Sequence, residues 1–319
     1  MEHAIVTGAA GFIGANIVRR LLEDGVEPHL FIAPGSARWR LAELEDHAPI
    51  VEVDVADHDG VATAVAKARA DRVYHLAAHG GYSWQTDHQA ILRANILGTS
   101  NMLEASLAQG FEVFVNTGSS SEYGLKDHAP TEDEVVNPNS TYAVAKVAAT
   151  MLCRQVAVRS GANVCTLRLY STYGPWEEPR RLVPALAVEG LRGRLPPLVD
   201  STIARDFVWV GDVVDAYLAA GHATHDEPGA IYNVGTGVQT TIAEAVEVTR
   251  DVLAVEARPQ WGSMPARAWD TSRWIADSSK IRDRLGWQAT LDFRAGLAAY
   301  AHWLRERPEV LSYYEAQRA

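Results

Sequence analysis

The sequence predicts an α/β fold in which helices cover both faces of a parallel sheet. Two observations lead to this prediction. Short apolar segments alternate with segments of helical periodicity through the first half of the chain, as repeated βα units do. A glycine-rich turn also separates the first apolar segment from the first helical one. Together they favour strands that are buried on both faces.

The elements are expected in the following order. An apolar strand at 4–9 leads into the glycines, and the helix after it, at 13–24, ends at Gly25. Further strands are predicted at 28–33, 49–55, 72–78, 111–119 and 163–170, with a short helix before 49 and longer helices at 59–70, 88–108 and 141–159. A last buried strand at 231–237 is expected to return to the sheet.

Composition excludes several classes of protein. The 319 residues carry a net charge of −11, with 22% charged and 47% hydrophobic residues, which is ordinary for a folded domain but disfavours a nucleic-acid partner. No apolar run approaches the roughly 18 residues of a membrane span, and no secretory signal is evident, so we expect a cytoplasmic location and no membrane partner. Cys153 and Cys165 lack metal or redox spacing, and the histidines form no ligand pair, so no metal site is expected.

The turn TGAAGFIG at 7–14 has the glycine pattern of a dinucleotide site. Such a site needs glycines for a tight turn, for close approach of backbone N–H groups to a pyrophosphate, and for packing of helix on strand. The helix N-terminus then favours the phosphates electrostatically. The residues assigned to this contact are Gly8, Gly11, Phe12, Ile13 and Gly14.

The glycine turn makes the expected sheet Rossmann-like and divides the chain. We expect a dinucleotide-binding domain at 1–174, completed by the returning strand near 231–237. Residues 175–319 are expected to form mainly a smaller, partly interleaved substrate-binding lobe. Prolines mark its beginning, at Pro175, Pro179, Pro184, Pro196 and Pro197.

The end of the second strand bears on the choice of nicotinamide cofactor. An NAD site usually has an acidic residue there for the ribose 2′-hydroxyl, but FIAPGSARWRL at 31–41 contains none. Ser36, Arg38 and Arg40 can instead bind a 2′-phosphate, which favours NADP(H). They can equally be loop residues on a solvated face, so NAD(H) stays open.

Tyr142 and Lys146 are candidates for catalysis because four residues separate them in a helical segment, which places both on one face. A lysine near a tyrosine stabilises the phenolate, so we expect a lowered pKa for Tyr142. Upstream, NTGSSSEYG at 116–124 places a run of hydroxyl groups at the end of a predicted strand. This serine-rich strand end and the glycine turn together indicate an oxidoreductase site.

These segments resemble the extended short-chain dehydrogenase/reductase family, whose members act mainly on nucleotide-activated sugars. The resemblance covers nearly the whole chain and includes TGAAGFIG, HLAA at 75–78, SSSEYG at 119–124, YAVAK at 142–146, LRLYSTYGP at 167–175, ARDFVWVGDVVDA at 204–216 and YNVGTG at 232–237.

The resemblance implies roles for individual residues. Asp54 and Val55 would hold the adenine, and Leu76, Ala77 and Ala78 would line the cofactor beside the nicotinamide. Tyr142 would be the general acid/base, Lys146 would bind the nicotinamide ribose, and a serine would hydrogen-bond the reacting oxygen. Ser119 is the expected serine, because it lies four residues before the tyrosine of the YG pair, with Ser120 and Ser121 as open alternatives.

The substrate end is also expected to carry arginines, because their planar fork suits a diphosphate. Arg205 matches the family's diphosphate arginine, and Arg267 and Asp270 are spaced like its phosphate- and ribose-contacting pair. Further candidate substrate contacts are Arg180, Arg181, Ser171, Tyr82 and Ser83.

Two departures from the family pattern shape the functional hypothesis. Sugar-nucleotide 4,6-dehydratases carry an Asp-Glu pair where this chain has Ser120 and Ser121, so dehydration is not expected. Ser171 also replaces an asparagine that many epimerases have. The leading hypothesis is therefore an NADP(H)-dependent reductase of a nucleotide-linked 4-keto-6-deoxy sugar. A 4-epimerase with bound NAD is the alternative, and a non-catalytic dinucleotide-binding protein is a remote one. The helices at 88–108 and 141–159 resemble those that form a family dimer interface, so a homodimer is expected.

Overall fold

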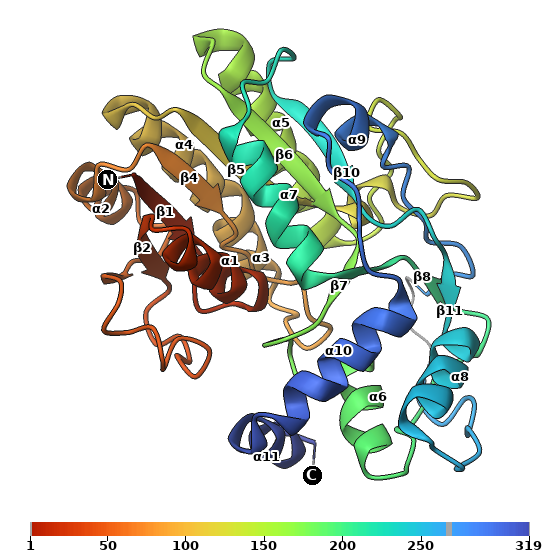
Figure 1. Ribbon diagram of the computed structural model, residues 1–319. Coiled ribbons are helices and arrows are strands. Elements are labelled where there is room, and N and C mark those ends of the chain that lie inside the picture. The colour runs from red at the N-terminus through yellow and green to blue at the C-terminus, as the bar shows by residue number, and fades with distance from the viewer. Residues whose placement is uncertain (1, 266–269, 319) are drawn as a thin grey trace.

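The computed structural model describes residues 2–265 and 270–318. A seven-stranded sheet forms the larger part of the molecule, and a mainly helical part lies against one end of its strands (Figure 1). All neighbouring strands are parallel, in the order β10-β6-β5-β4-β1-β2-β3. Their bounds are β1 His3–Thr7, β2 Glu27–Ile32, β3 Ile50–Glu52, β4 Arg72–His75, β5 Val113–Ser119, β6 Val164–Leu169 and β10 Ala230–Val234. The predicted Rossmann-like fold class is confirmed.

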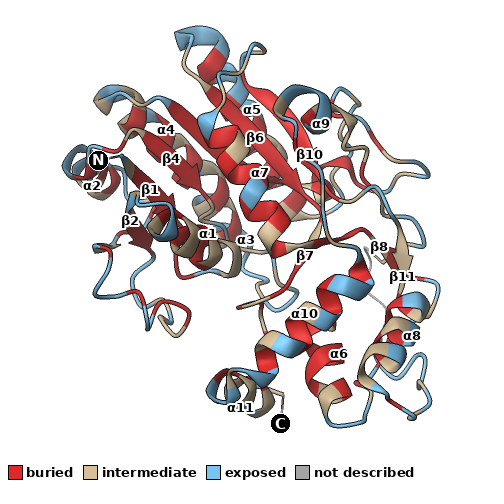
Figure 2. Ribbon diagram, viewed as in Figure 1, coloured by how far each residue is buried: buried red, intermediate tan, exposed pale blue. Residues whose placement is uncertain are grey.

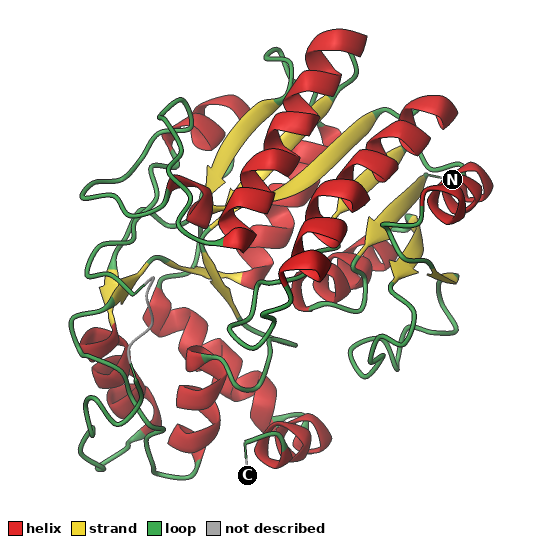
Figure 3. Ribbon diagram, turned by 180° about the vertical axis from the view of Figure 1, so that it is seen from behind, coloured by secondary structure: helices red, strands yellow, loops and turns green. Residues whose placement is uncertain are grey.

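Each face of the sheet has its own hydrophobic core, because successive strand side chains point to opposite faces. In β1, Ala4 and Val6 belong to one core and Ile5 belongs to the other. The first core is covered by α1 (Phe12–Glu23), α7 (Val210–His222) and α9 (Ser279–Leu285). The second is covered by α2 (His58–Ala68), α4 (Gly98–Gln109) and α5 (Thr141–Ser160), seen in front of the sheet in Figure 3. The central strands are accordingly buried on both faces, whereas the edge strand β3 is partly exposed (Figure 2).

Two segments differ in detail from the sequence-based expectation. The predicted helix at 88–108 consists of α3 (His88–Leu92), a π-helical turn (Arg93–Leu97) and α4, which follow one another without a break in helical backbone. The short helix expected before residue 49 is absent; residues 33–49 form successive turns instead. Leu41 and Leu44 in these turns are buried in the first core, so packing rather than helical hydrogen bonding holds the segment.

The helical part has a third core, formed by residues from the C-terminal half of the chain. Its helices are α6 (Leu182–Leu191), α8 (Ile242–Leu253), α10 (Phe293–Arg305) and α11 (Pro308–Ala316). Two small sheets join it to the larger part: β7 (Ser171–Tyr173) pairs with β9 (Phe207–Trp209), and β8 (Ala204–Arg205) pairs with β11 (Thr240–Thr241). β10 returns to the large sheet beside β6. Among the described residues, no helix has the length and apolar character that crossing a bilayer requires.

Candidate active site

The carboxyl ends of the central strands open onto a cavity of about 740 Å³. Residues of the sheet edge and of the helical part line it together, and open α/β sheets bind their ligands at this edge. Most of the site residues predicted from the sequence line this cavity: Gly8, Gly11, Phe12, Ile13, Gly14, Leu76, Ala78, Tyr82, Ser83, Ser119, Ser120, Ser121, Tyr142, Lys146, Ser171, Arg181, Arg205 and Asp270. Folding thus gathers side chains and backbone from distant parts of the sequence around one space.

Other predicted residues lie outside the cavity wall. Ala77 donates its N–H to Thr7 Oγ1 at 3.0 Å, and Asp54 accepts from the backbone N–H of Ala56 at 2.9 Å. Val55 is buried in the second core, where it packs against the helix that begins at Gly98. Arg267 lies outside the residues that the structure describes. The adenine contacts expected of Asp54 and Val55 therefore stay predictions.

The glycine turn has the backbone geometry that a pyrophosphate needs. Gly8 has φ +66°, and a Cβ on Gly14 would lie 2.4 Å from the carbonyl oxygen of Gly8, so neither position accepts a larger residue without rearrangement. The N-cap of α1 is Gly11, and no side chain caps the helix there. Because uncapped N–H groups and the positive end of the helix dipole meet at the cavity, the turn fits the phosphates of a dinucleotide.

The arginines after β2 do not all remain candidates for a 2′-phosphate. Arg40 is buried, and its guanidinium donates to the carbonyl of Trp176 at 2.6 Å and to that of Ala10 at 3.4 Å. The interpretation of Arg40 as a phosphate ligand is therefore wrong, because its side chain is buried, is bonded to two backbone carbonyls and does not line the cavity. Arg38 is partly exposed and forms an ion pair with Glu52. Ser36 lies in the same turn and donates its backbone N–H to Ala33.

Tyr142 and Lys146 share one face of the first turns of α5, which begins at the N-cap Ser140. The Ser140 side chain accepts a hydrogen bond from the N–H of Ala143 at 3.1 Å and so fixes the start of this helix. The ammonium nitrogen of Lys146 lies 5.9 Å from the centre of the Tyr142 ring and donates to the carbonyl of Thr117 at 3.0 Å. The lysine is therefore held by β5, beside the phenol rather than on its oxygen.

Burial dominates the protonation of both side chains. It raises the pKa of Tyr142 to about 12, although the Ser119 hydroxyl and the charge of Arg181 act in the opposite direction. It lowers the pKa of Lys146 to about 8, against the charge of Glu122. The expected lowering of the Tyr142 pKa by Lys146 is wrong for the chain alone, since the phenol keeps its proton at neutral pH.

The serines follow β5 in a short 3₁₀ turn, Ser120–Tyr123, that a buried acid holds in place. Glu122 accepts the backbone N–H of Ser119 at 2.9 Å, forming a capping box with it. The second oxygen of Glu122 binds the guanidinium of Arg168 at 2.9 Å and the hydroxyl of Thr150 at 3.0 Å. Since Glu122 is fully buried and all these bonds point away from solvent, its role in this structure is to hold the serine turn.

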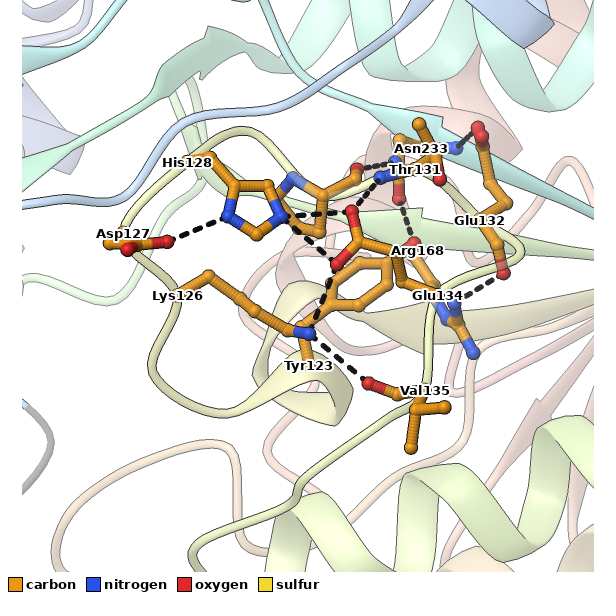
Figure 4. A network of polar contacts seen from close by, with 11 residues as sticks. Tyr123, Lys126, Asp127, His128, Thr131, Glu132, Glu134, Val135, Arg168 and Asn233 are labelled. Carbon is orange, nitrogen blue, oxygen red and sulfur yellow. Dashed lines mark hydrogen bonds and ion pairs between the residues drawn. The ribbon is translucent and has the colours of Figure 1, made fainter.

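The loop between this turn and α5 is tied to the sheet (Figure 4). The hydroxyl of Tyr123 donates to Asn233 of β10 at 2.8 Å, and the N–H of Asn233 donates to the Glu132 carboxylate at 2.8 Å. At the outer end of the loop, His128 contacts both Asp127 and Glu134. Because both ends of the loop are anchored, the serines and Tyr142 are held in a fixed relation.

Arg205, also in the cavity wall, lies on β8 with its guanidinium 2.8 Å from the Asp270 carboxylate and 5.7 Å from the ring of Trp274. Trp274 also donates its indole N–H to the hydroxyl of Ser120 at 3.1 Å. Next to Arg205, the buried Asp206 accepts from four donors of the segments after β10 and before α9, at 2.6–3.0 Å. The guanidinium of Arg205, which the family resemblance implies as a diphosphate ligand, is thus held in place at the cavity wall.

Comparison with known proteins identifies the group to which this chain belongs. Residues 4–235 match the NAD dependent epimerase/dehydratase family. The chain belongs to this family. It is 31% identical over 313 residues to a dTDP-glucose 4,6-dehydratase of Streptomyces griseus, covering 94% of this chain and 93% of that one. It is also 31% identical to a UDP-glucose 4-epimerase of Mycolicibacterium smegmatis (96% and 100% covered) and 27% identical to a GDP-6-deoxy-D-mannose reductase of Pseudomonas aeruginosa (93% and 95% covered).

Solved structures of the family show the same fold. A UDP-glucose 4-epimerase of Thermotoga maritima with UDP-glucose superposes with a TM-score of 0.87 at 27% identity, covering 95% of this chain and 99% of that one. The Thermus thermophilus UDP-glucose 4-epimerase in complex with NAD gives a TM-score of 0.85 at 28% identity, with 96% and 99% covered. This family member is therefore an enzyme of the extended short-chain dehydrogenase/reductase class, and its relatives act on nucleotide sugars.

Three features of this family member's cavity were not found by sequence reasoning. Glu177 is a buried acid in the cavity wall, within a proline-rich stretch whose sequence gave no sign of burial. The Trp84 ring stacks on Tyr82 at 4.8 Å, and the Arg180 guanidinium lies 3.8 Å from the centre of the Trp84 ring. Thr117 is the residue whose carbonyl holds Lys146, and the only signal for it was its position at the end of a strand.

Proposed function

We propose that this protein is a reductase of a nucleotide-linked 4-keto-6-deoxy sugar. The observation that carries the proposal is the placement of Tyr142, Ser119 and Lys146 in the wall of one cavity, where burial keeps the phenol protonated. A protonated phenol is ready to give a proton to a forming alkoxide, as a reduction requires. The two positions after Ser119 carry hydroxyl groups, and the acid that follows them, Glu122, is engaged by Arg168, which argues against dehydration.

Each member of the site has one task in this reaction. A bound nicotinamide supplies hydride to the keto carbon. Tyr142 donates the proton to the keto oxygen, and Ser119 polarises that oxygen by a hydrogen bond. Lys146, held by the Thr117 carbonyl, lies where it can bind a ribose hydroxyl beside the phenol. Arg205, with Asp270 and Arg267, receives the diphosphate and ribose of the substrate.

The glycine turn and the edge of β4 hold the cofactor in this proposal, and its preferred form is NADP(H). The turn after β2 contains no acid for a 2′-hydroxyl, while Ser36 and Arg38 are near enough in sequence to bind a 2′-phosphate together. Arg38 must first leave Glu52, whose carboxylate competes with the phosphate. The ratio of kcat/KM for NADPH over NADH should therefore rise in Glu52→Gln and fall in Arg38→Ala. An unchanged ratio in both variants contradicts the assignment.

The decisive experiment measures NADPH and NADH oxidation with dTDP- and GDP-linked 4-keto-6-deoxy sugars. Tyr142→Phe should lower kcat by about 10²- to 10⁴-fold, since it removes the proton donor. Tyr74→Phe is the matched control: Tyr74 is fully buried but does not line the cavity, so its variant should retain wild-type turnover. If no such sugar is reduced by the wild type, the reductase proposal fails. Unchanged turnover in Tyr142→Phe would instead favour a non-catalytic binding protein.

A 4-epimerase is the second candidate, favoured by the likeness to UDP-glucose 4-epimerases over the whole chain. It would use the same three residues, oxidising C4 and reducing it from the other face. Purified protein that carries stoichiometric NAD and interconverts two UDP-hexoses without added cofactor would decide for this reaction.

We also propose that the protein is a homodimer through α4 and α5. Large apolar side chains are exposed along α5, at Val144, Met151 and Val158, and at Leu97 in the π-helical turn that leads into α4. Exposed apolar side chains that recur along a helix are typical of an association surface. A monomeric mass in light scattering would contradict this proposal.

A further inference from the structure

Glu177 is a buried carboxyl group in the wall of the cavity that the proposed reaction does not use. Its residue exposure is 4%, and Oε1 lies 3.5 Å from Nε of Arg181. Oε2 is buried and has no hydrogen-bond partner of good geometry among the described residues, and the backbone of Gly174 is a further polar group beside this carboxyl. An unpaired buried oxygen of this kind costs about 1–3 kcal/mol. Such a group in a native cavity calls for a partner that arrives with a ligand.

The backbone around Glu177 is held in place from several directions. Trp176, before it, has φ +71°, a left-handed conformation that is unfavourable for a residue with a side chain. The Trp176 carbonyl accepts from buried Arg40 at 2.6 Å, and the Glu177 carbonyl accepts from the hydroxyl of Tyr314 in α11 at 2.7 Å. The contacts of Arg40 and Tyr314 thus hold the backbone of Glu177 at the cavity wall. A side chain that binds a ligand needs such a fixed position.

Glu177 and Arg181 line the same cavity as Tyr142 and Tyr82. The charge of Arg181 reaches the Tyr142 phenol and acts to lower its pKa. Both Arg181 and Glu177 also influence the pKa of Tyr82, which burial raises. The acid and the arginine therefore share one cavity with the tyrosine at which the reacting carbon of the sugar is proposed to lie.

We propose that Glu177 and Arg181 together bind one hydroxyl group of the sugar ring away from the reacting carbon, an inference that rests on the proposed nucleotide-sugar substrate. A sugar hydroxyl both donates and accepts, so it needs an acceptor and a donor side by side. Arg181 supplies a donor, and Glu177 supplies an oxygen without a partner. Burial raises the pKa of Glu177 to about 8, which leaves a neutral acid able to bond in either direction.

Two other ligand chemistries fit these residues less well. An ammonium group on the sugar would meet the guanidinium of Arg181, which already places a positive charge beside Glu177. A carboxylate on the sugar would compete with Glu177 for Arg181 and would repel Glu177 whenever that acid is ionised. A neutral hydroxyl avoids both conflicts.

The test compares binding of UDP-glucose and of UDP alone by calorimetry, with the dTDP pair measured in parallel. Glu177→Met removes the polar oxygens at similar size and should weaken UDP-glucose binding by about 10- to 100-fold while leaving UDP binding unchanged. Glu177→Gln keeps a donor and an acceptor and should bind within about threefold of wild type. Glu178→Met is the matched control, because the neighbouring Glu178 pairs with Arg180 and does not line the cavity.

Singly deoxygenated UDP-glucose analogues identify the hydroxyl. For wild type, the analogue that lacks the bound hydroxyl should have an affinity about 10-fold or more below that of UDP-glucose. For Glu177→Met, the same analogue and UDP-glucose should bind with equal affinity. The inference is overturned if Glu177→Met loses affinity equally for UDP and UDP-glucose, or if it loses affinity for neither. Tighter binding of UDP-glucuronate by Glu177→Met than by wild type overturns it in favour of a carboxylate site on Arg181. A wild type that binds no nucleotide at all defeats the proposed function itself and the inference with it, which is a distinguishable result.

Discussion

Replacing Glu122 by Gln should destabilise the protein and disturb catalysis together. Glu122 and Arg168 are 0% and 1% exposed, with their charged atoms 2.9 Å apart. The amide of glutamine can accept at only one of its two ends, so at least one of the donors at Ser119, Thr150 and Arg168 loses its partner. Breaking a buried ion pair from one side leaves an uncompensated charge, which costs about 3–5 kcal/mol of unfolding free energy.

An exposed ion pair in the same protein is the control for this predicted loss of unfolding free energy. Arg38 and Glu52 have side chains that are 39% and 47% exposed, so Glu52→Gln should change the unfolding free energy by less than about 1 kcal/mol. Urea unfolding, followed by circular dichroism, measures both variants, and the shift in midpoint at unchanged slope gives the difference. A loss in Glu122→Gln no larger than that in Glu52→Gln would refute the reasoning.

A double-mutant cycle separates the ion pair from packing. Arg168→Met alone leaves Glu122 as a buried unpaired charge, and Glu122→Leu alone leaves Arg168 as one. Each single variant should be at least as damaging as Glu122→Gln. Glu122→Leu combined with Arg168→Met removes both charges and should recover a large part of the stability, because the desolvation of two ions is avoided. Turnover should not recover in the double variant, since the Ser119 N–H still lacks its acceptor. Additive stability losses would show that the pair contributes nothing beyond its separate contacts.

The remaining predictions concern the glycine turn, a surface histidine and a helix cap. Gly14→Ala should abolish dinucleotide binding in a fluorescence titration, because its Cβ would lie 2.4 Å from a carbonyl oxygen of the turn; binding at wild-type affinity would contradict the phosphate site. Hydrogen bonds to Asp127 and then Glu134 raise the pKa of His128 above 6.5, so this contact stabilises the fold below pH 6.5 and is lost as the pH rises through the raised pKa. The Tm difference between wild type and His128→Gln should therefore be largest in acid and vanish in alkali. Asp292→Ala removes the N-cap of α10 and should cost about 1 kcal/mol in urea unfolding, whereas a change near zero would show that the cap is unimportant.

Local sequence patterns were sufficient for the order of the elements in the sheet domain. The apolar segment His3–Thr7, which ends at Gly8, is typical of a buried strand, and the glycine-rich turn after it has the pattern of a phosphate-binding turn. Tyr142 and Lys146 were found for a similar reason, since a spacing of four residues on a helix fixes their relative direction. Such features depend on neighbours in the chain.

The burial and pairing of individual charged side chains depended instead on segments that are distant in the sequence. Arg40 and Arg38 are two residues apart in one loop, yet packing against Trp176 buries the first and leaves the second on Glu52. Glu122 and Glu177 look alike in sequence, but Arg168 and two other donors satisfy the first, while the second has an oxygen without a partner. The pKa of Tyr142 also followed from burial, which outweighed the nearby lysine.

The sequence by itself determined the parallel sheet, the phosphate-binding turn and the tyrosine–lysine pair, because each follows from backbone periodicity and short-range spacing. Only the tertiary structure decided which carboxyl groups and arginines face the cavity, because burial and ion pairing are set by side chains that come from β6, α5 and α11. The side chains that would contact a substrate are therefore the part of this enzyme that is hardest to predict from the sequence alone.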